Sequence, residues 1–225
     1  MEITLLIGLI IFSYLLGNVS FARIIAQRHK VDITKQGSGN PGATNTLRTL
    51  GGKAGLAVFL LDILKGAIPA LVGVLVFGGY VGLEHGIILM GTSESYLALY
   101  LCGFASVLGH AFPVVYQFKG GKGVASVLGM CIVAQPICTL IIFLICFLVM
   151  LFVKYMSVMS MIFVTLVISL QLCFLPSGTS AILYVLLALV WALTIFFHRS
   201  NIARLIKGEE RKIDLLKYFK KRSSD

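Results

Sequence analysis

The chain has 225 residues, of which 58% are hydrophobic and only 12% are charged, and its mean hydropathy is +0.97. A water-soluble domain of this length needs more charged residues to cover its surface, and the chain is too short for two domains with separate cores. The composition therefore excludes soluble classes. It predicts one integral membrane domain, residues 1–206, followed by a basic cytoplasmic tail, residues 207–225.

The net charge of +10 comes from 19 Lys and Arg residues that are unevenly spread. Most lie in residues 23–53, 119–122 and 199–222, and none lies in residues 79–96. Because cytoplasmic loops hold the Lys/Arg excess, the basic segments are expected inside and residues 79–96 outside. Membrane topology explains part of this charge. Anionic lipid headgroups or phosphorylated substrates explain the remainder better than nucleic acid, because the basic residues lie in short loops beside the bilayer.

Apolar runs of about 20 residues are long enough to cross a bilayer. The first such runs predict spans at residues 3–25, 54–78 and 97–116. A cytoplasmic loop, residues 26–53, and an external loop, residues 79–96, join them.

Residues 124–198 begin and end beside basic clusters, so this stretch must cross the membrane an even number of times. Four crossings fit if the chain turns at Pro136, near Lys154 and at residues 176–178. The expected fold is an all-α polytopic membrane protein with seven transmembrane helices, the N-terminus outside and the C-terminus cytoplasmic. The alternative is five transmembrane helices, in which residues 124–153 form one helix and residues 155–198 re-enter the membrane.

In the tail, Ile213, Leu216 and Phe219 recur every three residues among lysines. This spacing predicts an amphipathic helix on the inner leaflet, with a frayed, solvated tail as the alternative.

A first polar cluster, the string GSGNPGATN at residues 37–45, follows the first span, and Arg48 lies just beyond it. Glycines let backbone N–H groups approach an anion, a following helix N-terminus adds positive potential, and Arg48 can bind a phosphate with two hydrogen bonds. The string formally fits a dinucleotide fingerprint, but no strand precedes it and the acidic partner, Asp62, lies in an apolar run. A phosphate-binding loop is the favoured interpretation, and an ordinary Gly/Asn/Pro turn is the alternative.

A second cluster combines His110 with a GGKG turn at residues 120–123. The turn resembles a phosphate-binding nest but lacks the spacing of a Walker A loop. An ionisable residue inside a membrane helix favours a functional role for His110, although a bond to a neighbouring helix would also explain it.

A third cluster, residues 198–204, places His198, Asn201 and Arg204 at spacings of three, so they can share one helical face. A basic flank after a span explains Arg204 but not His198 or Asn201.

Asp62 and Lys65 are three residues apart in the second span, so they can pair and support the site. The sequence contains no HxxxxD pair, no GxSxG elbow and no carboxylate cluster suited to catalytic metals. We therefore expect no metal or cofactor, and a substrate that arrives already activated.

Three strings, GSGNPGATNTLRTLGGKAG with LLDILKGA, GHAFPVVYQFKGGKGVAS, and HRSNIARLIKGEE, occur in this order. In order and spacing the chain resembles the bacterial integral-membrane acyl-phosphate:glycerol-3-phosphate acyltransferases, from the first span to about residue 212. The resemblance implies transfer of an acyl chain from acyl-phosphate to the 1-hydroxyl of glycerol-3-phosphate, giving lysophosphatidic acid and phosphate. It also implies seven helices in the bacterial cell membrane, with the site at the cytoplasmic side.

The resemblance assigns roles by position. It implies that the Ser38 loop holds acyl-phosphate and that Arg48 helps to hold glycerol-3-phosphate. The residues expected at the reaction centre are Ser38, Arg48, Lys122, His198 and Asn201. Those expected to bind substrate are Gly37, Gly39, Asn40, Gly42, Thr44, Asn45, His110, Gly120, Gly121, Gly123, Ser157, Arg204 and Glu210. The chain departs from the family pattern at two positions. It has Thr34 where the family often has Arg, and Glu209 where the family usually has Thr. These differences are expected to affect fine substrate preference and not the reaction.

No residue is suited to forming a covalent intermediate, so positioning and charge stabilisation would carry the reaction. The hydroxyl proton would pass to a substrate phosphate oxygen, which we favour, or to His198. The rival classes are an organophosphate transporter and an acyltransferase that uses acyl-CoA. A transporter should hold its polar groups near the midplane, often with inverted repeats, whereas here they gather at one face.

Overall fold

The computed structural model describes residues 2–84, 87–175 and 179–220, which are mostly helical. The α-helices in these ranges are α1 (Ile3–Gly17), α2 (Phe21–Arg28), α3 (Ala43–Leu50), α4 (Gly52–Val76), α5 (Ser93–Ala111), α6 (Val124–Ala134), α7 (Pro136–Val153), α8 (Met156–Cys173), α9 (Ala181–Phe197), α10 (Arg199–Ile206) and α11 (Leu215–Lys220). Two short 3-10 helices, η1 (Ile33–Lys35) and η2 (Val114–Tyr116), and an antiparallel hairpin of β1 (Tyr80–Glu84) and β2 (Ile87–Met90) complete them.

Within the described ranges, five helical stretches are long and apolar enough to cross a membrane. They are Ile3–Arg28, Gly52–Val76, Ser93–Tyr116, Pro136–Val153 and Met156–Cys173. Helices α9 and α10 form a sixth if they are one span bent by 51°. Helix α6 is apolar but has 11 residues, so it is roughly half as long as the hydrocarbon core is thick.

The expected turns at Pro136 and near Lys154 are confirmed, because α7 begins at Pro136 and ends against Lys154 in the left-handed conformation. The expected turn at residues 176–178 lies outside the described residues. The segment expected as an external loop, residues 79–96, connects two spans but has regular structure of its own. That segment carries the β-hairpin and the first turn of α5, which begins at Ser93 rather than at the expected residue 97.

The cytoplasmic loop expected at residues 26–53 contains a helix, α3, directly after the glycine-rich string. The first span is not continuous either, since α1 ends at Gly17 and α2 begins at Phe21. Lys65 donates a hydrogen bond to the Val19 carbonyl in this break, at 2.9 Å. A charged side chain from α4 thus satisfies a backbone group that the break exposes.

Helices α4 and α6 approach each other closely because glycines face the contact. A Cβ on Gly66 would lie 2.1 Å from the Ser126 carbonyl oxygen, and one on Gly129 would lie 2.0 Å from that of Ile63. Small residues are enriched where membrane helices meet, because they permit such backbone contact. This contact fixes α4, which carries Asp62, against the helix that follows the GGKG turn.

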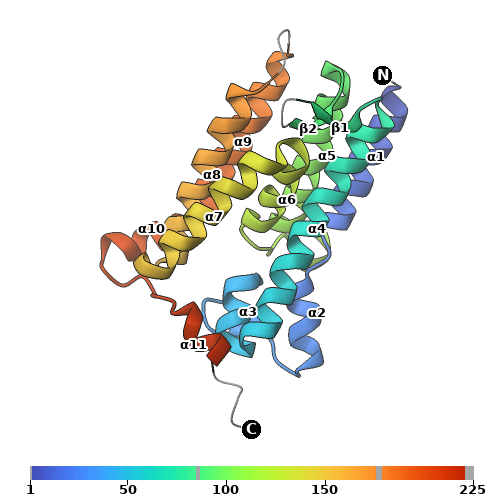
Figure 1. Ribbon diagram of the computed structural model, residues 1–225. Helices are drawn as coiled ribbons and strands as arrows, with labels where there is room; N and C mark the ends of the chain where they lie inside the picture. Colours follow the sequence, from blue (N-terminus) through green and yellow to red (C-terminus); the bar gives the residue numbers. More distant parts are fainter. Residues whose placement is uncertain (1, 85–86, 176–178, 221–225) are drawn as a thin grey trace.

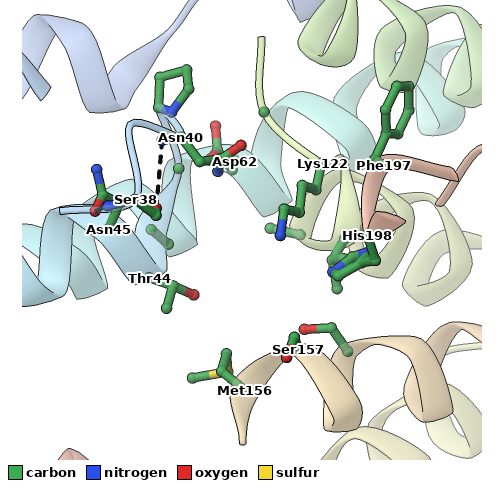
Figure 2. Close-up of a pocket in the computed structure, with 18 of the residues that line it drawn as sticks. Ser38, Asn40, Thr44, Asn45, Asp62, Lys122, Met156, Ser157, Phe197 and His198 are labelled. Atoms are coloured by element: carbon green, nitrogen blue, oxygen red, sulfur yellow. Dashed lines mark hydrogen bonds between the residues drawn. The ribbon is translucent and has the colours of Figure 1, made fainter. Parts of the chain in front are cut away.

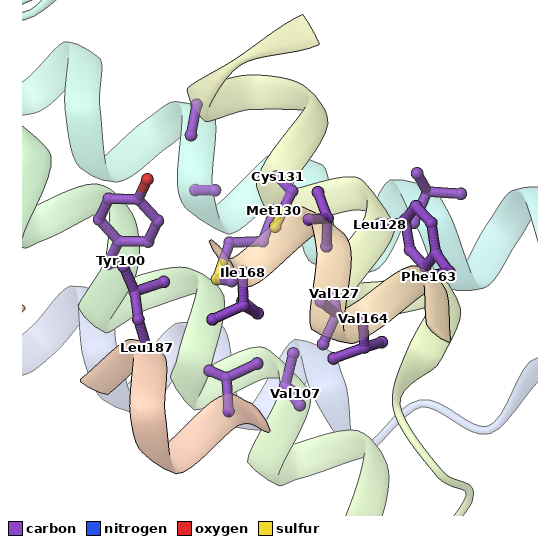
Figure 3. Close-up of a cluster of buried hydrophobic side chains, with 14 of the residues drawn as sticks. Tyr100, Val107, Val127, Leu128, Met130, Cys131, Phe163, Val164, Ile168 and Leu187 are labelled. Atoms are coloured by element: carbon purple, nitrogen blue, oxygen red, sulfur yellow. The ribbon is translucent and has the colours of Figure 1, made fainter. Parts of the chain in front are cut away.

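The hydrophobic core surrounds the short helix α6. Met130 and Cys131 of α6 are fully buried against Tyr100 of α5, Ile168 of α8 and Leu187 of α9 (Figure 3). Because α4, α5, α7 and α8 all pack on α6, they fix its position and that of the turn preceding it.

The two ends of the molecule differ in charge. Figure 1 shows the N-terminus and the β-hairpin at one end, and α2, α3 and α11 at the opposite end. The expectation that basic segments distant in sequence share one end is therefore confirmed. In the tail, Ile213 is 2% exposed, packed on the protein rather than free for a leaflet, whereas the side chains of Leu216 and Phe219 are outside the described set.

Candidate active site

All three polar clusters line one cavity of about 1620 Å³. Its walls come from the loop before α3, from α4, from the turn before α6, and from α7, α8 and the junction of α9 with α10. In Figure 2, Ser38 and Thr44 lie across the cavity from Lys122 and His198, and Ser157 approaches from a third side. Residues far apart in the sequence thus face one space.

The loop that carries Ser38 is shaped by Asn45. The Asn45 amide accepts a hydrogen bond from the Ser38 backbone N–H at 2.9 Å and donates to the Ile33 and Gln36 carbonyls at 3.1 and 2.9 Å. Asn45 is 1% exposed, so its side chain is occupied within the loop. The turn also depends on Gly37, whose φ is +58° and which leaves no room for a Cβ beside Asn45.

This geometry modifies the assignment of Gly37 to substrate binding. Gly37 contacts Asn45 and is not part of the cavity lining, whereas Ser38, Gly39 and Asn40 are. The Ser38 hydroxyl lies 3.4 Å from the Asn40 backbone nitrogen (Figure 2), and Gly42 and Thr44 also face the cavity.

Arg48, one turn into α3, is half-buried at the cavity wall. Its guanidinium donates a hydrogen bond to the Arg211 carbonyl at 3.0 Å. Burial lowers the pKa of Arg48, but a guanidinium stays protonated in proteins, so the group remains a cation with several free donors.

The GGKG turn rests on His110. The Gly121 backbone N–H donates to the His110 carbonyl at 3.0 Å, and a Cβ on Gly121 would lie 2.1 Å from the His110 ring. A Cβ on Gly120 would lie equally close to the His110 carbonyl oxygen. These two glycines let the turn pack flat on α5, while Gly123, at φ +80°, redirects the chain into α6.

Lys122 projects from this turn toward α10 and donates a hydrogen bond to the Asn201 amide oxygen. Burial lowers the pKa of Lys122 to about 8, although the nearby Glu210 carboxylate opposes the shift. Beside it, His198 is buried and its Nδ1 lies 2.8 Å from the Thr194 carbonyl oxygen. Because a carbonyl only accepts, Nδ1 carries the proton and Nε2 is the nitrogen left to accept one.

Glu210 is the centre of a hydrogen-bond network. It accepts hydrogen bonds from Asn201 at 2.7 Å, Ser157 at 2.8 Å and Arg204 at 2.8 Å. Burial opposes ionisation of Glu210, but these three hydrogen bonds outweigh it and hold its pKa below the usual value. Asn201 and Arg204, expected on one helical face, thus converge on one carboxylate, and His198 lies just before the bend.

Asp62 and Lys65 form a buried ion pair of 3.0 Å within α4. The Asp62 carboxylate also lies 3.7 Å from the His110 imidazole and lines the cavity, whereas Lys65 points away to Val19. The pair links the break between α1 and α2 to the helix beneath the GGKG turn.

The other end of the cavity is apolar and is lined by α4, α7 and α8. Phe143 stacks on Phe59 with ring centroids 5.8 Å apart and meets Phe163 edge-on at 6.0 Å. Leu56 and Leu144 also line the cavity although they are 46% and 55% exposed. The cavity therefore reaches the outer apolar surface between α4 and α7.

Reasoning from sequence missed Arg23 and this aromatic end. Arg23 lines the cavity, donates to the Lys119 carbonyl at 2.8 Å and lies 4.5 Å from the Tyr116 ring centroid. Its only sequence signal was its position as the first basic residue after the first span. The phenylalanines lie in apolar runs in which lipid-facing and cavity-facing positions look alike.

The cavity is therefore two-sided. One end holds hydroxyls, glycine turns and the cations Arg48, Lys122 and Arg204, a set suited to phosphate groups. The other end is aromatic and open to the apolar surface, which suits an acyl chain.

Comparisons with known proteins agree with this chemistry. Residues 7–208 match the family model described as glycerol-3-phosphate acyltransferase. A glycerol-3-phosphate acyltransferase of Aquifex aeolicus (strain VF5) is 41% identical over 91% of this chain and 97% of its own length. One from Clostridioides difficile (strain 630) is 40% identical over 95% of this chain and 98% of its own length.

Two crystal structures of PlsY (YgiH), an integral membrane glycerol 3-phosphate acyltransferase, are also similar. The glycerol 3-phosphate form superposes with a TM-score of 0.81 at 37% identity, covering 96% of this chain and 99% of that one. The lysophosphatidic acid form gives 0.78 at 37% identity, covering 95% and 98%. On this fold, these matches and a cavity built from all three motifs, the chain belongs to the glycerol-3-phosphate acyltransferase family of integral membrane proteins.

Proposed function

We propose that this protein transfers an acyl chain from acyl-phosphate to the 1-hydroxyl of glycerol-3-phosphate, giving lysophosphatidic acid and inorganic phosphate. The observation that carries the proposal is a cavity with a cationic, glycine-lined end and an aromatic end open to the apolar surface. The solved relative, described in glycerol 3-phosphate and lysophosphatidic acid forms, supports the acceptor and the product.

In this proposal the two phosphates occupy neighbouring sites in the polar end of the cavity. The Ser38 loop holds the acyl-phosphate, with its chain directed toward Phe143 and Phe59. Arg48 and Lys122 hold the phosphate of glycerol-3-phosphate. Figure 2 shows the Ser38 loop and Lys122 facing each other across open space, which supports a direct meeting of donor and acceptor.

The reaction needs no covalent enzyme intermediate. The 1-hydroxyl oxygen attacks the carbonyl carbon of the mixed anhydride, the carbon–oxygen bond to phosphate breaks, and phosphate leaves with the bond electrons. The hydroxyl proton passes to a substrate phosphate oxygen. His198 Nε2 is the alternative acceptor, since Nδ1 is engaged by Thr194. Positioning and the fixed cations then supply most of the rate enhancement.

We also infer seven membrane segments in the bacterial cell membrane, with the N-terminus outside and the site facing the cytoplasm. Helix α6 is the short seventh segment, and the bent pair of α9 and α10 is one segment. The Lys and Arg residues of α2, α3 and the C-terminal region, gathered at one end, support this orientation.

The decisive experiment supplies purified protein in liposomes with glycerol-3-phosphate and either acyl-phosphate or acyl-CoA. We expect lysophosphatidic acid and phosphate, in equal amounts, from acyl-phosphate only. Ser38→Ala should lower kcat/KM about a hundredfold, as expected when a donor to developing charge is lost, and Arg48→Ala should lower it about as much through a raised KM for glycerol-3-phosphate. Ser93→Ala and Arg28→Ala, at exposed positions outside the cavity, are matched controls. Absence of product from acyl-phosphate would refute the proposal.

A second measurement tests the proton acceptor. If a substrate phosphate oxygen takes the proton, His198→Gln should retain some activity with an unchanged pH–rate profile. If the decline in rate at low pH disappeared from the pH–rate profile of this variant, the proton would be assigned to His198 instead.

A further inference from the structure

The family model matches residues 7–208, and the similarity to a solved member of the family covers 96% of the chain, so it extends into the segment that turns back over the cavity. We call residues 211–220 the C-terminal strap. Its first anchor is Ile213, which is 2% exposed and whose backbone N–H donates to the Lys154 carbonyl at 2.8 Å. A buried side chain and a backbone hydrogen bond are features of a docked segment rather than a frayed tail.

Side chains tie the strap to the same turn between α7 and α8. The Lys154 ammonium and the Asp214 carboxylate form an ion pair of 2.8 Å, in which both side chains are about 40–45% exposed. Lys212 lies over the Tyr155 ring, 5.5 Å from its centroid. Three consecutive strap residues, Lys212, Ile213 and Asp214, thus contact the turn.

The far end of the strap reaches the opposite wall of the cavity. Leu215 lines the cavity, and Leu215 and Tyr218 pack against the hydrophobic core. Helix α11 packs on α4, and Figure 1 shows it beside α3. The strap therefore joins α8, on one side of the cavity, to the helices that carry Arg48 and Asp62.

Where the strap begins, it contacts Arg48 directly. The Arg211 carbonyl accepts one hydrogen bond from the Arg48 guanidinium at 3.0 Å. A guanidinium has five N–H donors, so one bond fixes its orientation and leaves the others for an anion. Without that bond, Arg48 must be ordered when substrate binds, which lowers affinity.

We propose that the C-terminal strap is a positioning element that holds Arg48 ready for the phosphate of glycerol-3-phosphate. This inference rests on the proposed function, because it takes glycerol-3-phosphate as the anion that Arg48 binds. Since Arg48 would contact the acceptor rather than the acyl-phosphate, the strap affects the two substrates differently. An interaction made equally in the ground and transition states changes KM and leaves kcat.

The test compares four proteins in liposomes: the full chain, a chain truncated after Lys212, Asp214→Asn, and the control Glu209→Gln. The control removes an exposed carboxylate from the same region. Truncation should raise the KM for glycerol-3-phosphate about tenfold, with kcat and the KM for acyl-phosphate within about twofold. Asp214→Asn should raise it about threefold at low salt and less at high salt, and Glu209→Gln should not change it.

A measurement without turnover completes the test. In the full chain, glycerol-3-phosphate should slow tryptic cleavage after Lys212 and Lys217, because ligand binding and strap docking stabilise each other. Inorganic phosphate should protect more weakly, and Arg48→Met should abolish protection. An active enzyme whose truncated form keeps its KM for glycerol-3-phosphate would overturn the strap proposal alone. An inactive full chain would instead contradict the proposed function.

Discussion

Two carboxylates with little exposed side-chain surface, Asp62 and Glu210, are compensated for the loss of water in different ways. Asp62, inside the α4 span, is neutralised by one cation, Lys65, which also holds the Val19 carbonyl. Glu210, beyond the last span, is satisfied by three donors from α8 and α10. The first carboxylate connects pieces of the scaffold, whereas the second arranges side chains that line the cavity. The comparison separates residues needed for folding from residues needed for turnover.

The largest expected effect comes from breaking the scaffold pair. Lys65→Met leaves a buried carboxylate without its cation and a backbone carbonyl without its donor, which should cost about 3–5 kcal/mol of folding free energy. Thermal unfolding in detergent would measure the loss. The double variant Asp62→Asn, Lys65→Met should recover most of it, because a neutral pair leaves no unpaired charge. A stable Lys65→Met protein would contradict the scaffold role.

The next effect should fall on activity and spare the fold. In Glu210→Gln, the side-chain NH2 replaces the oxygen that accepts from Arg204, so two donors face each other. The remaining oxygen is neutral and accepts weaker hydrogen bonds from Asn201 and Ser157. We expect kcat/KM for glycerol-3-phosphate to fall about 10- to 100-fold, since hydrogen bonds to charged groups are lost, while the melting temperature changes little. If Glu210→Gln were as unstable as Lys65→Met, the contrast between the two carboxylates would be lost.

A pH titration sharpens the comparison, because Lys122 belongs to the Glu210 network and has a pKa of about 8. Only the protonated ammonium attracts a phosphate. Thus kcat/KM for glycerol-3-phosphate should fall about tenfold per pH unit above that pKa. Lys122→Arg should shift this decline to higher pH, because arginine stays protonated. An identical decline in both proteins would assign the titration to another group.

The smallest expected effect concerns Arg23, which holds the turn leading to Lys122 through the Lys119 carbonyl and the Tyr116 ring. Arg23→Gln should lower kcat/KM about two- to fivefold, as for the loss of a partly exposed hydrogen bond and a cation–π contact. Arg23→Lys should keep part of the activity. Equal loss in both variants would show that the planar guanidinium is essential.

Charge and motif spacing predicted much of this molecule. The clustering of Lys and Arg placed the ends of the spans, and three glycine- or base-rich strings marked the residues that share the cavity. The spans and the phosphate-binding strings can be predicted from sequence because bilayer thickness and phosphate binding restrict which residues can follow one another locally.

The remaining features depend on contacts between distant residues. Glu210 meets Asn201 and Ser157 only because α10 bends by 51° from α9 and the chain then returns over α8. Nothing local at residues 18–20 predicts that a lysine from α4 fills that break. Ile213 is likewise buried because its segment docks on the Lys154 turn. The three-residue spacing of apolar residues in the tail does not show this contact, and from sequence alone it indicated a helix on the lipid surface.

The lateral opening beside Leu56 and Leu144 has a kinetic consequence. An acyl donor that enters there comes from the membrane. Its effective concentration is therefore its mole fraction among the lipids and not its concentration in the whole sample. Adding inert lipid would dilute the donor and slow the enzyme, while the acceptor, drawn from water, would be unaffected. The product would diffuse away in the leaflet, and the leaving phosphate would depart through the opposite, aqueous side.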